Sequence, residues 1–116
     1  MSRPSHERLR DILERIDAIR IAEDLLVVAE AAKEEGLART AFDAILYDLL
    51  VIGEAIKALP DGVRAKHQEI PWVNIAKLRD LLAHIYFKIN SEVIMRTIDT
   101  PLSDLRTVCQ SEIASN

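Results

Sequence analysis

The stretch "AFDAILYDLLVIGEAIKALP", residues 41 to 60, carries the clearest helical pattern in the sequence. Its apolar residues recur every three or four positions, a spacing that places side chains on one face of an α-helix. The stripe consists of Phe42, Ile45, Leu46, Leu49, Ile52, Gly53, Ile56 and Leu59. Thr40 is a possible N-cap, and Pro60-Asp61-Gly62 would end the helix. The pattern predicts one long amphipathic helix.

Three further stretches repeat this periodicity. They cover residues 9–36, 71–82 and 90–109. Gly36 would cap the first helix, Pro71 would take the first position of the next, and Thr100-Pro101 would kink the last one. Asn90 or Ser91 would start that last helix, and no segment alternates with the period of a strand. We therefore expect an all-α, antiparallel four-helix-bundle-like domain with an extra short helix and a kinked C-terminal helix.

The composition favours one folded domain spanning residues 1–116. Apolar residues make up 49% and charged residues 29%, enough for a core and a polar surface. Cys109 is the only cysteine and cannot form an intramolecular disulfide. The N-terminus has no signal-peptide pattern, and no apolar run reaches the ~18 residues of a membrane span. A soluble cytoplasmic protein is expected.

Charge is unevenly distributed along the chain. The net charge is -4, but residues 55–90 carry 6 basic and 3 acidic side chains, which gives +3. The basic residues are Lys57, Arg64, Lys66, Lys77, Arg79 and Lys88. This balance excludes a broad, salt-driven DNA binder and permits a small local phosphate site.

Gly53 stands inside a helical stripe, where glycine costs about 1 kcal/mol relative to alanine. Close packing of another helix would compensate for that cost. The neighbour could belong to the same chain or to a second subunit, and the first is slightly favoured. We nevertheless expect a dimer interface to include the surface around Gly53 and the third predicted helix.

The run "KLRDLLAHIYFKIN", residues 77 to 90, threads polar residues through an apolar segment. On an ideal helix Arg79 and Tyr86 share nearly one face, whereas His84 lies roughly 140° from Arg79. Either the helix ends near His84, or a second chain completes the site. Each residue also has a structural explanation: Arg79 could pair with Asp80, His84 could be a core histidine, and Tyr86 could be a half-buried aromatic residue.

The combination "RDLLAHIY" resembles the Arg-x4-His-x-Tyr signature of the HEPN superfamily of small helical ribonucleases, and specifically its HepT-like branch. The segment "YDLLVIGEAIKALP" is similar to the "IGEA" helix of that branch. "IPWVNIAKLRDLLAHIYFKIN" resembles its motif segment, and "DTPLSDLR" resembles its C-terminal stretch. The resemblance covers nearly the whole chain, and the order of the segments makes it specific.

The resemblance implies a metal-independent endoribonuclease without a cofactor, the toxin of a toxin-antitoxin pair. RNA supplies its own nucleophile, the 2′-hydroxyl next to the scissile phosphate. His84 suits acid-base work and Arg79 suits a phosphorane oxygen, while Asp80 would orient one of them. His6 and His67 are far from His84 in sequence, and a single cysteine cannot build a zinc site.

The family arrangement also implies a homodimer in which two copies of the motif line one cleft. It implies further that a nucleotidyltransferase antitoxin transfers AMP to the Tyr86 hydroxyl and blocks the site with phosphate charge. Tyr86 could instead stack on substrate or simply pack. Four basic residues could steer RNA, although a solvated face is the commoner role for each. They are Lys77, Lys88, Lys66 and Arg64.

Two alternatives remain open. The chain could be a non-catalytic helical dimer that binds only a protein partner, with Arg79 and His84 in a structural polar network. It could also bind RNA or a nucleotide without cleaving it. A mutation of His84 would separate binding from turnover.

Overall fold

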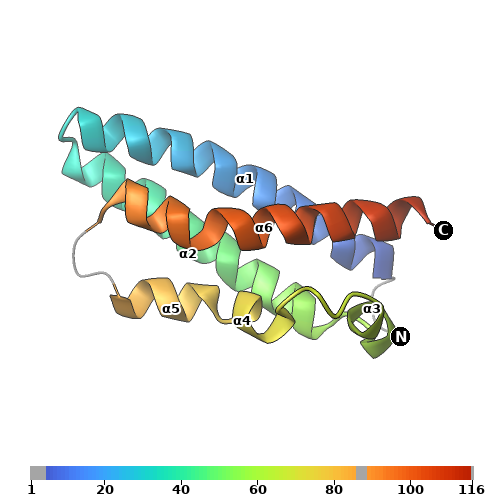
Figure 1. Cartoon of the computed structure of the whole chain (residues 1–116). Coiled ribbons are helices and arrows are strands. Elements are labelled where there is room, and N and C mark those ends of the chain that lie inside the picture. Colours follow the sequence, from blue (N-terminus) through green and yellow to red (C-terminus); the bar gives the residue numbers. More distant parts are fainter. Residues whose placement is uncertain (1–4, 86–88, 116) are drawn as a thin grey trace.

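The computed structural model describes residues 5–85 and 89–115, and every regular element in these ranges is a helix. The helices are α1 (Ser5–Ala31), α2 (Glu35–Lys57), α3 (Asp61–Lys66), α4 (Trp72–Ala76), α5 (Leu78–Ile85) and α6 (Ser91–Ala114). Figure 1 shows them in a bundle that measures 46 × 24 × 22 Å. The predicted all-α class is confirmed.

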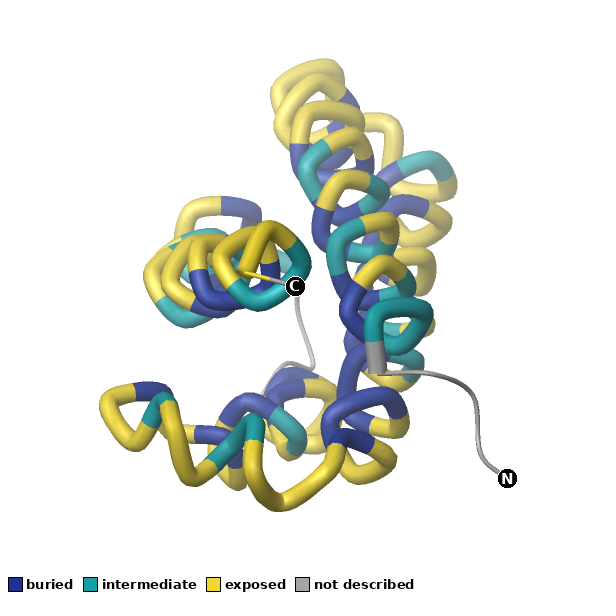
Figure 2. Tube along the Cα trace, turned by 90° about the vertical axis from the view of Figure 1, so that its right-hand side faces the viewer, coloured by how far each residue is buried: buried dark blue, intermediate teal, exposed yellow. Residues whose placement is uncertain are grey.

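The long helices α1 and α2 form an antiparallel hairpin that carries the other elements. α6 packs along α1, while α4 and α5 pack on α2 (Figure 1). Figure 2 shows buried residues turned toward the space between these helices. They form one hydrophobic cluster, whose fully buried members include Ile16, Ile19, Ile45, Leu49, Ile52, Leu82, Ile98 and Leu102. Burial of these apolar stripes is the main favourable term in folding.

The turn between α1 and α2 differs from the prediction. α1 ends at Ala31 rather than at Gly36, and Lys33 takes the left-handed conformation with φ 59°. Glu34 N–H donates to the Ala29 carbonyl at 2.9 Å, and Lys33 N–H donates to the Glu30 carbonyl at 3.1 Å. These two bonds are those of a Schellman motif. The helix end is therefore built from main-chain bonds, which the sequence pattern did not reveal.

The predicted N-cap at Thr40 is wrong for the same reason. α2 already begins at Glu35, five residues earlier, because the Schellman turn redirects the chain at once. The Thr40 hydroxyl instead donates to the Gly36 carbonyl at 3.0 Å, one turn back in the helix. Gly36 lies inside α2 and caps nothing.

The third predicted helix is divided in two. Lys77, with φ −101° and ψ 2°, separates α4 from α5, and Pro71 precedes α4 as its N-cap residue. The short α3 is an additional helix before this pair, as expected. In α6, Asn90 is the N-cap and accepts a hydrogen bond from Val93 N–H at 3.2 Å. That helix runs without interruption across Pro101, so the kink remains a prediction.

Gly53 faces the chain's own α4. A Cβ atom built at Gly53 would lie 2.8 Å from the backbone oxygen of Ala76, closer than Cβ atoms come to other heavy atoms in proteins. The glycine is also buried. The intrachain explanation for this glycine therefore holds, and Gly53 itself is not available to a second subunit.

Polar contacts tie α6 to its neighbours at intervals along its length. From its start to its end they are Ser91 with Glu30, Asp99 and Ser103 with Arg20, Arg106 with Asp17, and Glu112 with Lys66 and His67. The partners Glu30, Arg20 and Asp17 lie on α1. Within the residues described here, no helix is both long and apolar enough to cross a membrane.

Candidate active site

The helix α5 presents Arg79, Asp80 and His84 to solvent. Leu78 and Leu82, four residues apart, are buried and fix one side of the helix against the core. The side chains of Arg79 and Asp80 are 44% and 69% exposed. His84 is also exposed. None of the three is a core residue, so the structural explanation of His84 as a satisfied core histidine is wrong.

Asp80 contacts both other members of the motif. Its Oδ1 accepts a hydrogen bond from Arg79 Nη1 at 3.1 Å, which is also an ion pair. Its main-chain carbonyl lies 2.7 Å from His84 Nδ1. A carbonyl oxygen only accepts hydrogen bonds, so Nδ1 must carry the proton. In the neutral ring Nε2 then holds the lone pair, ready to accept a proton.

The structure describes α5 from Leu78 to Ile85, and His84 lies within it. The two arrangements expected for the motif, a helix that ends near His84 and a site completed by a second chain, stay predictions. Tyr86 and Lys88 lie outside the described residues, so their predicted roles stay predictions.

The remaining basic candidates are spread along the molecule. Arg64 pairs with Asp61 at 2.6 Å, and Lys66 pairs with Glu112 at 3.2 Å. Both lie on α3, which Figure 1 places beside the C-terminal part of α6, away from α5. Lys77, exposed between α4 and α5, is the one described member of this group that lies next to the motif helix.

The other candidate chemistries find little support in the described residues. No group of three or more His, Cys, Asp or Glu side chains among them could hold a metal ion. Burial raises the pKa of the Cys109 thiol to about 12, so Cys109 is a core residue and not a nucleophile. His67 accepts or donates a hydrogen bond with Glu112 at 2.6 Å and joins α3 to α6. Trp72 is buried in the hydrophobic core, and its Nε1 donates to the His67 carbonyl at 3.0 Å.

Sequence reasoning missed a buried carboxylate between α1 and α6. Glu23 is 3% exposed, and Arg20 Nη1 donates to Glu23 at 3.0 Å and to Asp99 at 2.6 Å. Burial, reinforced by the Asp99 carboxyl group and opposed by Arg20, raises the pKa of Glu23 to about 7. The signal was present, because Glu23 falls between Ile19 and Leu26 on the buried stripe of α1.

This helical domain exposes an arginine and a histidine of fixed tautomer on one helix. An arginine can bind phosphate oxygens and a histidine can transfer protons, so the domain is of a class that can act on phosphate esters. The family model "Ribonuclease HepT-like" matches residues 7–112 of this chain. The chain belongs to the ribonuclease HepT-like family. The predicted resemblance is confirmed.

Several curated proteins resemble the chain. The "Probable ribonuclease HepT" of Thermococcus cleftensis is 34% identical over 108 residues, which cover 91% of this chain and 93% of that protein. A "Putative RNase" of Caldanaerobacter subterraneus subsp. tengcongensis is 44% identical over 62 residues, and another of Methanocaldococcus jannaschii is 49% identical over 51. The chain matches only 55% and 42% of the lengths of these two relatives. No solved structure matches the chain.

Proposed function

We propose that this chain is an endoribonuclease that cleaves RNA with Arg79 and His84 of α5 and needs no metal ion. The observation that carries the proposal is the contact of 2.7 Å between His84 Nδ1 and the Asp80 carbonyl. It leaves the lone pair on Nε2 of this exposed residue, where it can take a proton. Membership of the HepT-like family and the names of the relatives point to the same activity.

In the proposed reaction the 2′-hydroxyl of RNA attacks the neighbouring phosphorus. Nε2 of His84 accepts the hydroxyl proton as the new O–P bond forms. Arg79 donates hydrogen bonds to the non-bridging oxygens, where negative charge grows in the transition state. The bond from phosphorus to the 5′ oxygen then breaks, and that oxygen takes up a proton. The products are a 2′,3′-cyclic phosphate and a 5′-hydroxyl end.

The leaving 5′ oxygen needs a second group that can give it a proton. One chain has only one motif histidine, His84, and this histidine is already used as the base. We propose that a homodimer supplies the second one, with two motifs facing one cleft. Exposed apolar side chains near the motif support such a contact: Leu81 lies on α5 itself, and Val73 lies on α4. Large apolar side chains at the surface often mark protein contacts.

The proposed biological role is that of the toxin in a pair with a nucleotidyltransferase antitoxin. The antitoxin would transfer AMP to the Tyr86 hydroxyl, two residues after His84. The added phosphate would bring negative charge to the site and repel the RNA backbone. The pairing would operate in the cytoplasm, where the RNA is.

The test is cleavage of a fluorophore-labelled single-stranded RNA by the purified dimer in excess EDTA. We expect wild-type protein to cleave it and His84→Ala to lose cleavage while still binding RNA. His6→Ala, which removes a histidine of α1, serves as the matched control and should stay active. If EDTA abolishes turnover by wild-type protein, the metal-independent reaction is wrong. If His84→Ala cleaves normally, the assignment of His84 is wrong, and if wild-type protein binds RNA without cleaving it, the non-catalytic alternative holds.

A further inference from the structure

A hollow of about 320 Å³ opens where the connector that follows α3 meets the start of α4. It is lined in part by Arg64, Gln68, Pro71, Trp72 and Asn74. Its volume is at the lower end of the range for ligand sites in proteins. Gln68 and Asn74 are exposed, and neither amide has a hydrogen-bond partner among the residues that the structure describes. A ligand in the hollow would therefore meet two amides, each of which offers donors and an acceptor.

The wall of the hollow is held in one conformation by the core. Ile70 and Trp72 are buried, and the His67 carbonyl accepts hydrogen bonds from Ile70 N–H at 3.2 Å and from Trp72 Nε1 at 3.0 Å. The His67 ring is fixed in turn, because its Nε2 lies 2.6 Å from Oε2 of Glu112 on α6. A preformed site has less ordering to do when a ligand binds, so the hollow is suited to recognition.

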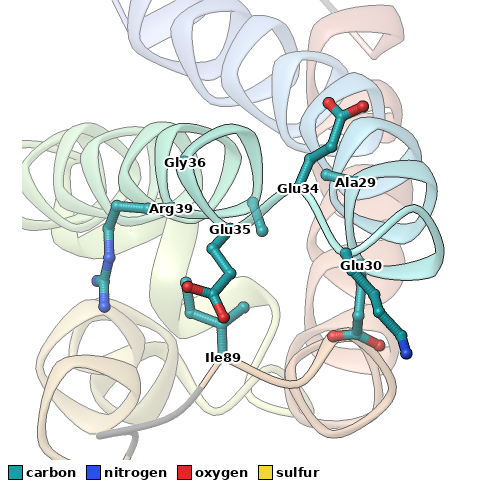
Figure 3. A pocket seen from close by; sticks show the side chains of 9 residues that line it. Ala29, Glu30, Glu34, Glu35, Gly36, Arg39 and Ile89 are labelled. Atoms are coloured by element: carbon teal, nitrogen blue, oxygen red, sulfur yellow. The ribbon is translucent and has the colours of Figure 1, made fainter.

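The charge of the hollow suits a neutral group better than a phosphate. No Asp or Glu side chain lines it, and its one charged lining residue, Arg64, is already paired with Asp61 at 2.6 Å. A larger hollow of about 650 Å³ at the turn between α1 and α2 differs, since Figure 3 shows the carboxylates of Glu30, Glu34 and Glu35 around it. These carboxylates would repel the RNA backbone. A nucleobase, which is uncharged, can enter the hollow beside α4 without meeting unpaired charge.

The hollow lies at the beginning of the pair of helices that carries the motif. Only Lys77 separates α4 from α5, so Asn74 precedes Arg79 by about 8 Å at the rise of an α-helix. Successive nucleotides of a strand are about 3.4 Å apart in a duplex, so RNA bound at Arg79 and His84 covers this separation within a few nucleotides. Val73, part of the proposed dimer contact, also borders the hollow. The hollow would therefore lie at the edge of the shared cleft.

We propose that this hollow binds one nucleobase of the RNA substrate, a few nucleotides from the scissile phosphate, and that Gln68 and Asn74 recognise it. Bases of single-stranded RNA can turn out of the stack, and proteins read them by hydrogen bonds to their edges. Each amide can pair with such an edge. The inference rests on the proposed function, because Arg79 and His84 place the strand. It adds a determinant of sequence preference to the site that cleaves the RNA.

A scan with abasic RNA tests the proposal. Each RNA in the series has one mapped cleavage site and lacks a single base while keeping the sugar-phosphate backbone. For wild-type protein, kcat/KM should fall about tenfold at one abasic position a few nucleotides from the cleavage site, the effect expected of one well-paired base. In the double variant Gln68→Ala/Asn74→Ala the same abasic RNA should differ from intact RNA by less than about twofold.

Gln110→Ala is the matched control, because Gln110 is an exposed amide on α6 that does not line the hollow. It should show the wild-type loss at the same abasic position. If the double variant keeps the full loss, or if Gln110→Ala removes it, the hollow does not bind the base and the inference is wrong. The inference also fails if no abasic position outside the cleavage site matters to wild-type protein.

Binding of the same RNAs, followed by fluorescence anisotropy, separates this inference from the proposed function. Wild-type protein should bind intact RNA about tenfold more tightly than the critical abasic RNA, and the double variant should bind both equally. If this difference is found but wild-type protein does not cleave RNA, the proposed function is wrong and the base site stands. If wild-type protein cleaves RNA but binds intact and abasic RNA equally well, the base site is wrong and the proposed function stands.

Discussion

At Asp80 the side chain and the main chain bind different neighbours. The carboxylate pairs with Arg79, whereas the carbonyl holds the His84 ring. Replacing the side chain removes only the first contact, because every residue type has the same carbonyl. The two contacts of Asp80 are therefore separable by mutation.

We expect Asp80→Ala to lower kcat/KM by about tenfold or less, since His84 keeps its tautomer and Arg79 loses only its partner. Arg79→Lys should lose about a hundredfold or more, because lysine keeps the charge but not the planar fork of donors. Steady-state cleavage of the labelled RNA measures both values. A loss in Asp80→Ala as large as that in His84→Ala would contradict the division of labour at this residue.

A single added atom at Gly53 should lower the stability of the fold. In Gly53→Ala the new Cβ would meet the Ala76 backbone oxygen at 2.8 Å, and neither helix can move without disturbing the core. We expect the free energy of unfolding to fall by about 1–3 kcal/mol, despite the better helix propensity of alanine. Urea unfolding measures it. Gly36→Ala is the control, because nothing lies within 4 Å of its added Cβ, and that variant should lose no stability.

At the scale of the elements, the contact between α1 and α6 includes two carboxyl groups that share one guanidinium nitrogen. Arg20 Nη1 donates to both Glu23 and Asp99. Because Glu23 is buried, its pKa in the folded protein rises from 4.5 to about 7. An acid with a raised pKa stabilises the fold while it is protonated, so this contribution is complete below the pKa of the unfolded chain.

We therefore expect the stability contributed by Glu23 to fall as pH rises from about 4.5, its ordinary pKa, to about 7, its pKa in the fold. Glu23→Gln keeps a hydrogen-bonding group but cannot ionise, so relative to wild type it should gain stability across this range. Thermal unfolding at pH 4, 5.5, 7 and 8 measures the difference. Asp24→Asn, on the exposed side of α1, is the control; an equal gain there would contradict the role of burial.

At the scale of the whole molecule, the proposed site depends on two chains. If the face that carries α5 forms the contact, Leu81→Glu should place a charge in the interface and shift the protein toward monomer, with loss of RNA cleavage. Light scattering at micromolar concentration should give twice the chain mass for wild type. Ile21→Glu, also at an exposed apolar residue but on α1, should remain dimeric. A wild-type monomer that cleaves RNA would contradict the shared site.

Regulation gives a second prediction at this scale. Tyr86→Phe keeps the ring and removes only the hydroxyl, so it should retain RNA cleavage and escape AMP transfer. When it is produced together with the nucleotidyltransferase partner, cells should stop growing, whereas wild type should be toxic only alone. Intact-protein mass spectrometry checks the modification. Covalent AMP on the Tyr86→Phe protein would show that another residue is the acceptor.

Much of this protein follows from its sequence. The stripe of residues 41–60 predicts α2, since burial on one face recurs with the helical period. The motif "RDLLAHIY", together with the order of the segments around it, carries the resemblance to the family before any geometry is known. The ends of the helices were harder to predict from the sequence. α1 ends at a Schellman turn in which Lys33 takes the left-handed conformation that glycine usually supplies, so the residue type at this position gave no signal of a helix end.

Only the tertiary structure decided which helix compensates for Gly53 and which nitrogen of His84 is free. Gly53 meets Ala76, 23 positions later, and the contact of Glu30 with Ser91 joins residues 61 positions apart. The periodicity of apolar residues shows which face of a helix is buried, but it does not show what packs against that face. The pattern involves only residues within a few turns of one another in the same helix. Contacts between distant residues arise only when the helices pack.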